Sequence, residues 1–406
     1  MLTSDEALER ILDLVRPVEG SAVPLQQARG RFLTKPVFAS VPIPRFDQSA
    51  MDGYAVAEDG CGAGAQGREL SVVREVAAGQ LCGEPVVPGS SVRVFTGAPV
   101  PPNTAAVVMQ EDVDEKAEGS NRMVRLREPP ERGEFIRRAG ADLCEGQEIA
   151  AAGDRVSPQR IGLFASQGLT SVPVGPVPTI SIVSTGDELV PIGQELHSDA
   201  TIYNSNGPML EALVAEAGAL SVPATRAGDD LESLQQVIRQ AVDACDILLV
   251  SGGVSVGDHD FTRPALEASG FSMDFWKVRM RPGKPLAVGS GNGRLAFGLP
   301  GNPVSAFVTF WLFVYPAIQR WMGAPIGQEG LPRLKVVAGE TLANHGDRPH
   351  WLRGCYDGGR FLLSGGIQAS HAIYGLSKAN MLACLPANHT VSEGEQLVGC
   401  LLPTGR

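Results

Sequence analysis

The stretch from Cys245 to Asp260 places the strongest constraint on how this 406-residue chain can fold. Residues 247–250 form an apolar run that is too short for a helix and is bounded by turn residues, which predicts a strand buried on both faces. Residues 251–257 then carry three glycines and two serines, so backbone N–H groups can approach a ligand without obstruction by Cβ atoms. This loop is typical of a phosphate site.

The same loop ends in two acids, Asp258 and Asp260. A carboxylate beside a phosphate is disfavoured by roughly 4 kcal/mol per charge pair at about 4 Å and an effective dielectric near ~20. We therefore predict a divalent cation between them, with Mg²⁺ preferred because it binds one or two carboxylates together with phosphate oxygens.

Two nucleotide-binding motifs do not fit this loop. Gly252 and Gly257 have the G-x-x-x-x-G spacing of a P-loop, but Asp258 and His259 follow where Lys and Ser or Thr are needed. The G-x-G-x-x-G motif fails on spacing. The alternative is a tight turn whose acids cap a helix starting near Phe261. The loop by itself does not decide between a ligand site and a capped turn.

Composition predicts an acidic, multidomain, soluble protein. The length predicts two to four domains. With 34 basic and 45 acidic residues the net charge is −11, which argues against non-specific nucleic-acid binding and against an anionic membrane surface. A cytoplasmic enzyme fits better. Seven scattered cysteines without a C-x-x-C pair indicate neither a disulfide framework nor a zinc site.

Two segments could be mistaken for targeting or membrane signals. Residues 3–15 predict a capped amphipathic helix and no signal peptide. The apolar run at residues 304–318 is about 15 residues long, against about 20 needed to span a membrane, and contains Ser305, Thr309 and Pro316. We expect it to be a buried core helix.

Residues 178–322 alternate between strand and helix patterns. Strands are expected at 179–184, 220–224, 247–250, 275–280 and 295–298, and helices at 208–217, 231–244 and from 304. This order predicts a three-layer α/β domain with a mainly parallel sheet, in which ligands bind outside the carboxyl ends of the strands.

Glycine, hydroxyl and carboxylate residues recur after these strands. They occupy residues 184–188, 228–230, 251–260 and 299–303, and residues 204–206 could join them. Capping explains any one of these loops but explains the set poorly, so we expect them to share one crevice. Within it, Glu188 and Asp260 are the candidate metal ligands.

A basic run beside the crevice is a candidate anion site. Lys277, Arg279, Arg281 and Lys284 supply its charge, and strand alternation would place the first three on one face. An exposed edge strand would show the same pattern. From about residue 328, short alternating runs predict a small β-barrel or sandwich. In that part, Ser370 and His371 are the one polar pair of a type found in catalytic sites, although a lone His is more often structural.

Residues 20–150 are expected to be β-rich and irregular. Asp52-Gly53 and Thr96-Gly97 would each be a turn by default, and composition alone assigns neither to a site. Arg137 and Arg138 lie close to Asp142. Adjacent arginines are usually a solvated face, but they could also make a forked contact with a phosphate or oxyanion.

Six motifs, in order and nearly from end to end, together resemble the molybdopterin molybdenumtransferases, namely MoeA and the gephyrin E domain. They are SAMDGYA at 49–55, TGAPVP at 96–101, STGDEL at 184–189, SGGVSVG at 251–257, PGKP at 282–285 and GLPGNP at 298–303. The resemblance implies a MogA-like three-layer α/β molybdopterin-binding domain, a β-rich second domain and a C-terminal β-barrel.

The resemblance also implies four domains in an elongated homodimer. These are the α/β domain (1–20 and 178–326), a linking and dimerisation domain (21–41 and 145–177), the β-rich domain (42–144) and the barrel (327–406). The implied reaction converts adenylylated molybdopterin and molybdate into molybdenum cofactor, AMP and water, assisted by Mg²⁺. The active cleft is expected between the α/β domain of one subunit and the β-rich domain of the other. The molybdopterin adenylyltransferase and acceptor molybdoenzymes are conceivable partners.

Roles transfer to this chain by motif. Glu188 and Asp260 would hold Mg²⁺, and Asp52 would act at the pyrophosphate or position the attacking oxygen. Lys277, Arg281 and Ser370 would bind molybdate or the pterin phosphate. The full catalytic set implied by the resemblance is Asp52, Thr96, Asp142, Asp229, Lys277 and Arg281. The ligand-binding set is Ser251, Gly252, Gly253, Ser255, Gly257, Pro300, Pro303, Ser370 and Arg137.

Three residues depart from the family pattern. Gln48 stands where Asn is usual, and Arg263 and Arg281 stand where Lys is common. Arg presents a planar fork and Lys a point charge, so the departure at residue 281 bears on oxyanion geometry.

Phosphoanhydride cleavage needs mainly positioning and charge neutralisation, and no Ser-His-Asp or Cys-His nucleophile is apparent in the sequence. Two other functions stay open. A metal-dependent nucleotide pyrophosphatase could use the same α/β domain and would release AMP without molybdate. A non-catalytic gephyrin-like scaffold is the other, although the joint presence of Asp52, Glu188 and Asp260 argues against it.

Overall fold

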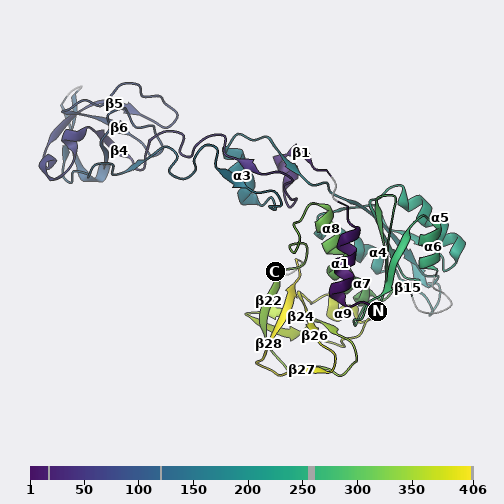
Figure 1. Ribbon diagram of the computed structural model, residues 1–406. Coiled ribbons are helices and arrows are strands. Elements are labelled where there is room, and N and C mark those ends of the chain that lie inside the picture. The colour runs from purple at the N-terminus through teal and green to yellow at the C-terminus, as the bar shows by residue number, and fades with distance from the viewer. Residues whose placement is uncertain (17–18, 119–120, 255–260, 404–406) are drawn as a thin grey trace. The chain divides into compact units, whose positions relative to one another are not determined.

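The computed structural model describes the chain except for residues 17–18, 119–120, 255–260 and 404–406, and it divides into two compact units (Figure 1). Unit 1 comprises Met1–Lys35, Ala152–Gly162 and Thr170–Arg406. Unit 2 comprises Pro36–Ala151 and Leu163–Leu169. The chain therefore leaves unit 1 twice, after Lys35 and within helix α3 (Pro158–Ser166), and re-enters it at Ala152 and at Thr170. The division into four domains stays a prediction.

A seven-stranded sheet forms the centre of unit 1, in the order β16-β13-β18-β21-β20-β19, with β17 also paired to β13. Strand β13 pairs in parallel with β16, β17 and β18, and β18 pairs in parallel with β21. Strand β20 is antiparallel to both of its neighbours. The strands are β13 (Thr179–Thr185), β16 (Leu220–Ser221), β17 (Thr225–Ala227), β18 (Ile247–Ser251), β19 (Ser272–Lys277), β20 (Pro285–Gly291) and β21 (Arg294–Leu299).

Strand β18 is buried on both faces, as its apolar run predicts. Ile247 and Leu249 join a core formed with α1 (Ser4–Leu14), α4 (Asn206–Glu216) and the helical segment after β21. Leu248 and Val250 join a second core formed with α5 (Leu231–Val242) and α6 (Thr262–Ala268). Because successive strand residues point to opposite faces, one apolar run packs against both helix layers, and the three-layer prediction is confirmed (Figure 1).

The apolar run from residue 304 is a buried core helix, as expected. It comprises α7 (Pro303–Thr309), a π-helical segment (Phe310–Val314) and α8 (Tyr315–Trp321). Trp311, Phe310 and Phe313 are almost fully buried there. Among the described residues, no helix is long and apolar enough to cross a membrane.

The first helix also matches its prediction. Helix α1 begins after Thr3, whose side chain accepts a hydrogen bond from the Glu6 backbone N–H while Glu6 bonds back to the Thr3 backbone. This reciprocal cap satisfies two N–H groups that the helix leaves unpaired. Ala7 and Ile11 face the core.

Two strand predictions are corrected, and one further strand is present. The strand expected at 220–224 is split into β16 and β17 around Pro223, which has no N–H for a strand ladder. The run expected at 275–280 ends as strand β19 at Lys277. Strand β20 was not expected, because its glycines interrupt the apolar pattern; it makes that edge of the sheet antiparallel.

The C-terminal part of unit 1 is a closed barrel, not a sandwich, in the strand order β22-β25-β24-β26-β28. Its interior is filled by apolar side chains such as Val336, Phe361 and Leu385. The barrel strands are β22 (Arg333–Ala338), β24 (His350–Asp357), β25 (Arg360–Leu363), β26 (Met381–Leu385) and β28 (Gln396–Leu401). Strands β23 (Leu342–Asn344) and β27 (His389–Val391) form a separate pair, and α9 is Ile373–Leu376.

Two short pairings complete unit 1. Strand β1 (Ser21–Pro24) pairs with β12 (Ser171–Val174), and α2 (Leu25–Ala28) follows β1 directly. Strands β14 (Leu189–Val190) and β15 (Ile202–Tyr203) pair in parallel.

Unit 2 is built on a six-stranded sheet in the order β7-β4-β6-β5-β9-β8. Tyr54 and Val56 of β4 enter one apolar cluster and Ala55 enters another, so both faces of this strand are covered. The expected β-rich character is confirmed. The strands are β4 (Gly53–Val56), β5 (Glu69–Val76), β6 (Ser90–Val94), β7 (Ala106–Met109), β8 (Val113–Glu118) and β9 (Asn121–Leu126).

Shorter elements flank this sheet. Strand β2 (Val37–Phe38) pairs with β11 (Glu148–Ala150), and β3 (Gln48–Ser49) pairs with β10 (Ile136–Arg137). Three single-turn 3-10 helices are η1 (Glu58–Gly60), η2 (Ala63–Ala65) and η3 (Gln110–Asp112).

Candidate functional site

A cavity of about 700 Å³ lies in unit 1 at the carboxyl ends of β13, β18 and β21. All four loops expected to share a crevice contribute described residues to it, and so does the segment 204–206, which was a possible member. Its described lining includes Ser184, Thr185, Glu188, Asn204, Ser205, Asn206, Asp229, Ser251, Gly252, Gly253, Pro300, Gly301, Asn302 and Pro303. Parallel strands bring their carboxyl ends to one edge, so residues more than a hundred positions apart in the sequence meet there.

The loop after β18 needs its glycines. Gly252 has a φ of +107°, and a Cβ atom there would lie 2.6 Å from the Thr185 carbonyl oxygen. Gly253 has a φ of +63°. The Gly252 N–H donates to the Leu299 carbonyl, and the Thr262 hydroxyl donates to the Gly252 carbonyl at 2.9 Å. The turn is thereby fixed between β21 and α6. Ser255 and Gly257 lie outside the described residues.

Among the described residues, two carboxylates line the cavity, Glu188 and Asp229. Asp229 accepts hydrogen bonds from the Thr185 hydroxyl at 2.8 Å and from the Asp187 backbone N–H at 3.3 Å. Its neighbour Asp230 instead caps α5 by accepting from the Ser233 backbone N–H. Within one loop, therefore, one acid lines the cavity and the next caps a helix.

The metal pair predicted from the sequence is only half described. Glu188 lines the cavity, whereas Asp260 lies outside the described residues, so the pair stays a prediction. In the part of the chain that the structure describes, no group of three or more His, Cys, Asp or Glu side chains is arranged to hold a metal ion.

Asn206 connects two of the cavity loops. Its Nδ2 donates to Ser251 Oγ at 2.8 Å and to the Gly301 carbonyl oxygen at 2.7 Å. The side chain is buried and lies at the start of α4. The sequence pattern marked residues 204–206 only as possible members of the crevice, because nothing in it specifies two partners so distant in the chain.

The basic residues predicted to contact an anion are not among the described residues that line this cavity. Lys277 ends β19, opposite Pro285 in β20. The Arg281 backbone pairs with the start of the barrel, where its N–H donates to the Pro349 carbonyl and its carbonyl accepts from the Trp351 N–H. Ser370 accepts a hydrogen bond from the Val304 N–H through its backbone carbonyl, and it is the adjacent His371 that lines the cavity.

A cationic cluster that the sequence did not reveal lies around Arg281. Burial, followed by the charges of Arg281 and Arg353, lowers the pKa of His350 from 6.5 to about 4. Arg353 is only 1% exposed, and its guanidinium donates to the Ala372 and Ile367 carbonyls at 2.7 and 2.8 Å. It therefore fixes the loop that carries Ser370 and His371. A buried arginine within an ordinary strand pattern gives no signal in the sequence.

In unit 2, the structure brings Asp52 and Thr96 together. The Thr96 N–H and hydroxyl donate to Asp52 Oδ1 at 2.7 and 2.8 Å. These bonds, from the backbone first and then from the side chain, lower the pKa of Asp52. Thr96 is exposed and Asp52 is partly exposed, so the pair presents an ionised carboxylate at the surface.

Arg137 and Asp142 are also exposed in unit 2. Arg137 lies in β10, opposite Gln48 of β3, and the Asp142 backbone N–H donates to the Ile43 carbonyl. Arg138 pairs with Asp47 at 2.6 Å, which is the solvated ion pair expected of adjacent surface arginines.

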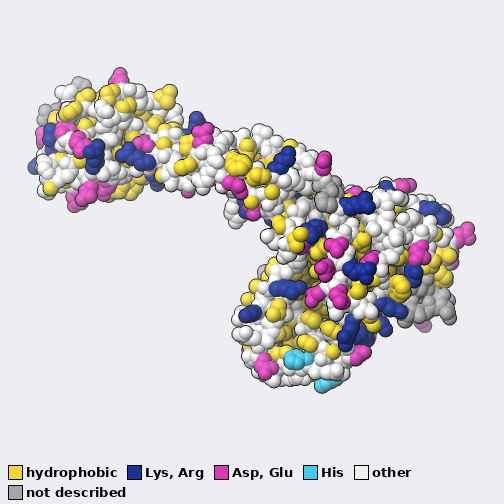
Figure 2. Space-filling model, viewed as in Figure 1, with side chains coloured by type: hydrophobic (Ala, Val, Ile, Leu, Met, Phe, Trp, Pro, Cys, Tyr) yellow, Lys and Arg dark blue, Asp and Glu magenta, His cyan; other side chains and the backbone are white. Residues whose placement is uncertain are grey.

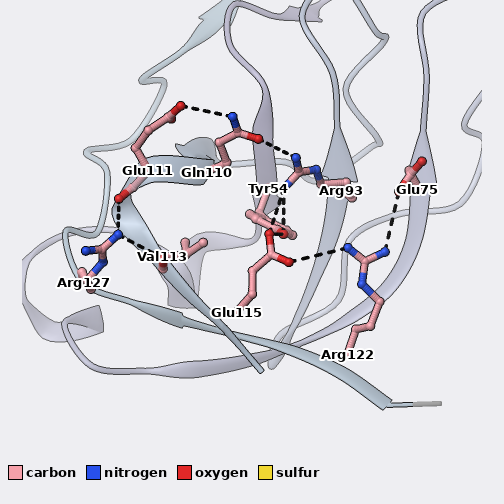
Figure 3. A network of polar contacts seen from close by, with 9 residues as sticks. All are labelled: Tyr54, Glu75, Arg93, Gln110, Glu111, Val113, Glu115, Arg122 and Arg127. Carbon is pink, nitrogen blue, oxygen red and sulfur yellow. Dashed lines mark hydrogen bonds and ion pairs between the residues drawn. The ribbon is translucent and has the colours of Figure 1, made fainter. Parts of the chain in front are cut away.

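A network of paired polar groups supports the strand that follows Asp52 (Figure 3). Arg93 donates to the Tyr54 hydroxyl at 2.7 Å and to Gln110 Oε1 at 2.6 Å, and it pairs with Glu115 at 3.2 Å. The Tyr54 hydroxyl also donates to Glu115. The Gln110 backbone N–H donates to the Asp52 carbonyl, which links the network to the candidate catalytic residue.

Basic and acidic side chains are interspersed over the face drawn in Figure 2, in keeping with such pairing.

Three family models match the chain. They are the MoeA N-terminal region (domain I and II) at residues 2–168, a probable molybdopterin binding domain at 181–320 and the MoeA C-terminal region (domain IV) at 335–398. The molybdopterin molybdenumtransferase 2 of Mycobacterium tuberculosis strain H37Rv is 36% identical over 397 residues, covering 95% of this chain and 96% of that protein. The chain belongs to the MoeA family. The resemblance seen in the six sequence motifs is thus confirmed.

Other MoeA relatives agree over nearly the full length. The molybdopterin molybdenumtransferase of Haemophilus influenzae is 34% identical over 401 residues, covering 97% of each chain. The crystal structure of the MoeA protein from Pyrococcus horikoshii OT3 matches with a TM-score of 0.80 at 26% identity, covering 99% of this chain and 100% of that one. The curated MoeA relatives are named as transferases, so the prediction of an enzyme is confirmed.

Proposed function

We propose that this MoeA protein inserts molybdenum from molybdate into adenylylated molybdopterin, with release of AMP. The observation that carries the proposal is the cavity at the carboxyl ends of β13, β18 and β21, which lies within the region matched by the molybdopterin-binding model. Its volume of about 700 Å³ suits a ligand of nucleotide size.

The cavity combines groups that suit a phosphoanhydride. Cleavage of that bond depends mainly on positioning and charge neutralisation. The turn at Gly252 and Gly253 lets backbone approach the ligand closely, and Asp229 is held in place by Thr185.

Mg²⁺ fits the donor chemistry of this cavity, because the acidic side chains that line it, Glu188 and Asp229, offer hard oxygen atoms. Glu188 and Asp260 would hold the ion. When bound, it would neutralise phosphate charge during loss of AMP.

Asp52 is proposed to supply a catalytic carboxylate. Its carboxylate stays ionised because Thr96 donates two hydrogen bonds to it, so it can position a donor or orient the attacking oxygen. Thr96 is assigned a supporting role, and Asp142 and Arg137 an auxiliary one. Homodimerisation belongs to the proposal, since the family resemblance expects the β-rich domain of one subunit to serve the α/β domain of the other.

Molybdate is assigned to the basic groups Lys277 and Arg281 and to Ser370. The charges of Arg281 and Arg353 both lower the pKa of His350, which supports a concentration of positive charge at the start of β24. Because His350 has a pKa of about 4, it is neutral near pH 7 and can offer a ring N–H to an oxyanion without adding charge.

The decisive measurement is AMP release from adenylylated molybdopterin by the full chain, with and without molybdate. We expect molybdate to accelerate release and molybdenum cofactor to form in step with AMP. Equal rates would remove the transferase function and favour a nucleotide pyrophosphatase. Restoration of molybdoenzyme activity in a strain without its own transferase separates catalysis from a scaffold role. Cytoplasmic action together with the adenylyltransferase and acceptor molybdoenzymes is part of the same proposal.

A further inference from the structure

Two polar atoms on the wall of the cavity are buried and have no hydrogen-bond partner among the described residues. They are Ser184 Oγ and Asn206 Oδ1. Ser184 is 1% exposed and Asn206 is 8% exposed, and both residues line the cavity. Because a buried polar group without a partner costs free energy, two of them in one cavity indicate groups that a ligand completes.

The orientation of the Asn206 amide follows from its contacts. The atom 2.7 Å from the Gly301 carbonyl oxygen must be the nitrogen, since a carbonyl oxygen can only accept. The same nitrogen donates to Ser251 Oγ, so both amide hydrogens are used. The remaining atom, Oδ1, is therefore an acceptor whose position is fixed by two loops.

Ser184 lies beside Ser251, to which Asn206 donates. It is the register partner of Ser251 in the parallel pair β13 and β18, so the two serines are neighbours on the same face of the sheet. Since Asn206 bonds Ser251, the cavity wall presents an amide oxygen and a hydroxyl that have no partner in the described part of the chain.

The acceptor Asn206 Oδ1 disfavours an anion as the direct ligand of this cluster. An amide oxygen accepts hydrogen bonds, and the oxygens of phosphate or molybdate at neutral pH also only accept. The complement of an acceptor beside a hydroxyl is an N–H donor beside an acceptor atom. The lactam edge of a pterin has this pattern, with an N–H beside a C=O, and the amino edge of adenine is the alternative that the AMP titration below tests.

We propose that Asn206 and Ser184 recognise the lactam edge of the pterin ring, with the ring N–H donating to Asn206 Oδ1 and the ring C=O accepting from Ser184 Oγ. This inference rests on the proposed function, because it takes molybdopterin as the ligand. It deepens that function by assigning the pterin end to the buried wall of the cavity. The phosphate end is then left to the glycine turn and the metal.

The test uses 6-hydroxymethylpterin phosphate, a stable fluorescent pterin, titrated against the full chain. Ser184→Ala removes a hydroxyl without a partner among the described residues, so we expect about five- to tenfold weaker binding and an unchanged melting temperature. Ser181→Ala is the matched control, because Ser181 lies on the same strand, is equally buried and donates to the Ala241 carbonyl at 3.0 Å. The control should lower the melting temperature and leave affinity unchanged.

A second ligand tests Asn206 without altering the protein. Methylation of the ring N–H removes the donor, so the N-methyl pterin should bind the unmodified chain about tenfold more weakly or worse. Equal affinities for the two pterins, or for Ser184→Ala and the unmodified chain, would overturn the inference. So would a loss of AMP affinity in Ser184→Ala with pterin affinity intact, because adenine would then occupy the wall. AMP release with and without molybdate remains a separate readout, so failure of the transferase function is distinguishable from failure of this assignment.

Discussion

The cavity of unit 1 and the surface around Asp52 in unit 2 differ in how far their polar groups are paired with other protein groups. The cavity holds neutral buried groups, of which Ser184 and Asn206 keep atoms without described partners, and its glycines allow close approach of backbone. Around Asp52, charged side chains are paired with one another, and the partly exposed carboxylate of Asp52 is held by Thr96.

The contrast separates binding from stability. Groups that a ligand must complete can be removed from the cavity at little cost to the fold, whereas groups in the Arg93 network already bond each other. In unit 2, therefore, we expect Asp52 to matter for chemistry and its neighbours to matter mainly for structure. The predictions below test this division.

The largest effect is expected for Asp52→Asn. The substitution keeps size and removes the charge, so AMP release should fall about 10²–10³-fold with an unchanged melting temperature. Asp114→Asn is the matched control, an exposed acid of the same unit in a surface ion pair with Arg127 at 3.4 Å. Full activity in Asp52→Asn would contradict the comparison, because Asp52 would then not be the catalytic carboxylate expected in unit 2.

Gly252→Ala tests whether the cavity turn tolerates a side chain. The added Cβ would lie 2.6 Å from a carbonyl oxygen at a φ of +107°, so we expect a loss of roughly 3 kcal/mol in the free energy of unfolding. Gly293→Ala shares a positive φ of +78° but has no described atom within 4 Å, and it should cost about 1 kcal/mol. Denaturant unfolding of both variants measures the difference, and equal losses would contradict a packed turn.

The pH dependence of stability probes the cationic cluster at the barrel. The pKa of His350 is lowered from 6.5 to about 4 in the folded chain, so the unfolded chain binds the extra proton between these values. The contribution of neutral His350 to the free energy of unfolding is complete above about pH 6.5. It should be lost on acidification towards pH 4, by on the order of 3 kcal/mol.

Unfolding of the chain and of His350→Asn at a series of pH values isolates this contribution. The variant should show a flatter profile in that window. Identical profiles would mean that His350 is not held neutral.

The smallest effect is expected for Tyr54→Phe. The hydroxyl bonds Arg93 and Glu115, but those two remain paired at 3.2 Å without it, so the loss of unfolding free energy should be about 1 kcal/mol. The rate of AMP release should stay within about twofold. A drop in rate without a drop in stability would sharpen the comparison by extending the catalytic group beyond Asp52 and Thr96.

Sequence patterns predicted most of the fold for a simple physical reason. Burial on both faces, alternation and capping are properties of short segments, which is why β18, α1 and the buried helix from residue 303 were identified correctly. Strand β20 was missed because its glycines conceal the apolar pattern, and the 220–224 strand was wrong because Pro223 divides it. Asp229 and Asp230 show the same limit at the site, since adjacent acids in one loop have different roles.

By itself, the sequence determined which segments are strands and helices, which loops must be rich in glycine, and that six motifs occur together in the order seen in the MoeA family. The tertiary structure alone decided which polar atoms meet. Asn206 bonds partners 45 and 95 residues away, and the charges of Arg281 and Arg353 converge on His350. Hydrogen bonds and charge interactions act over a few ångströms, so their partners are fixed by how the strands are ordered in the sheet and not by spacing along the chain.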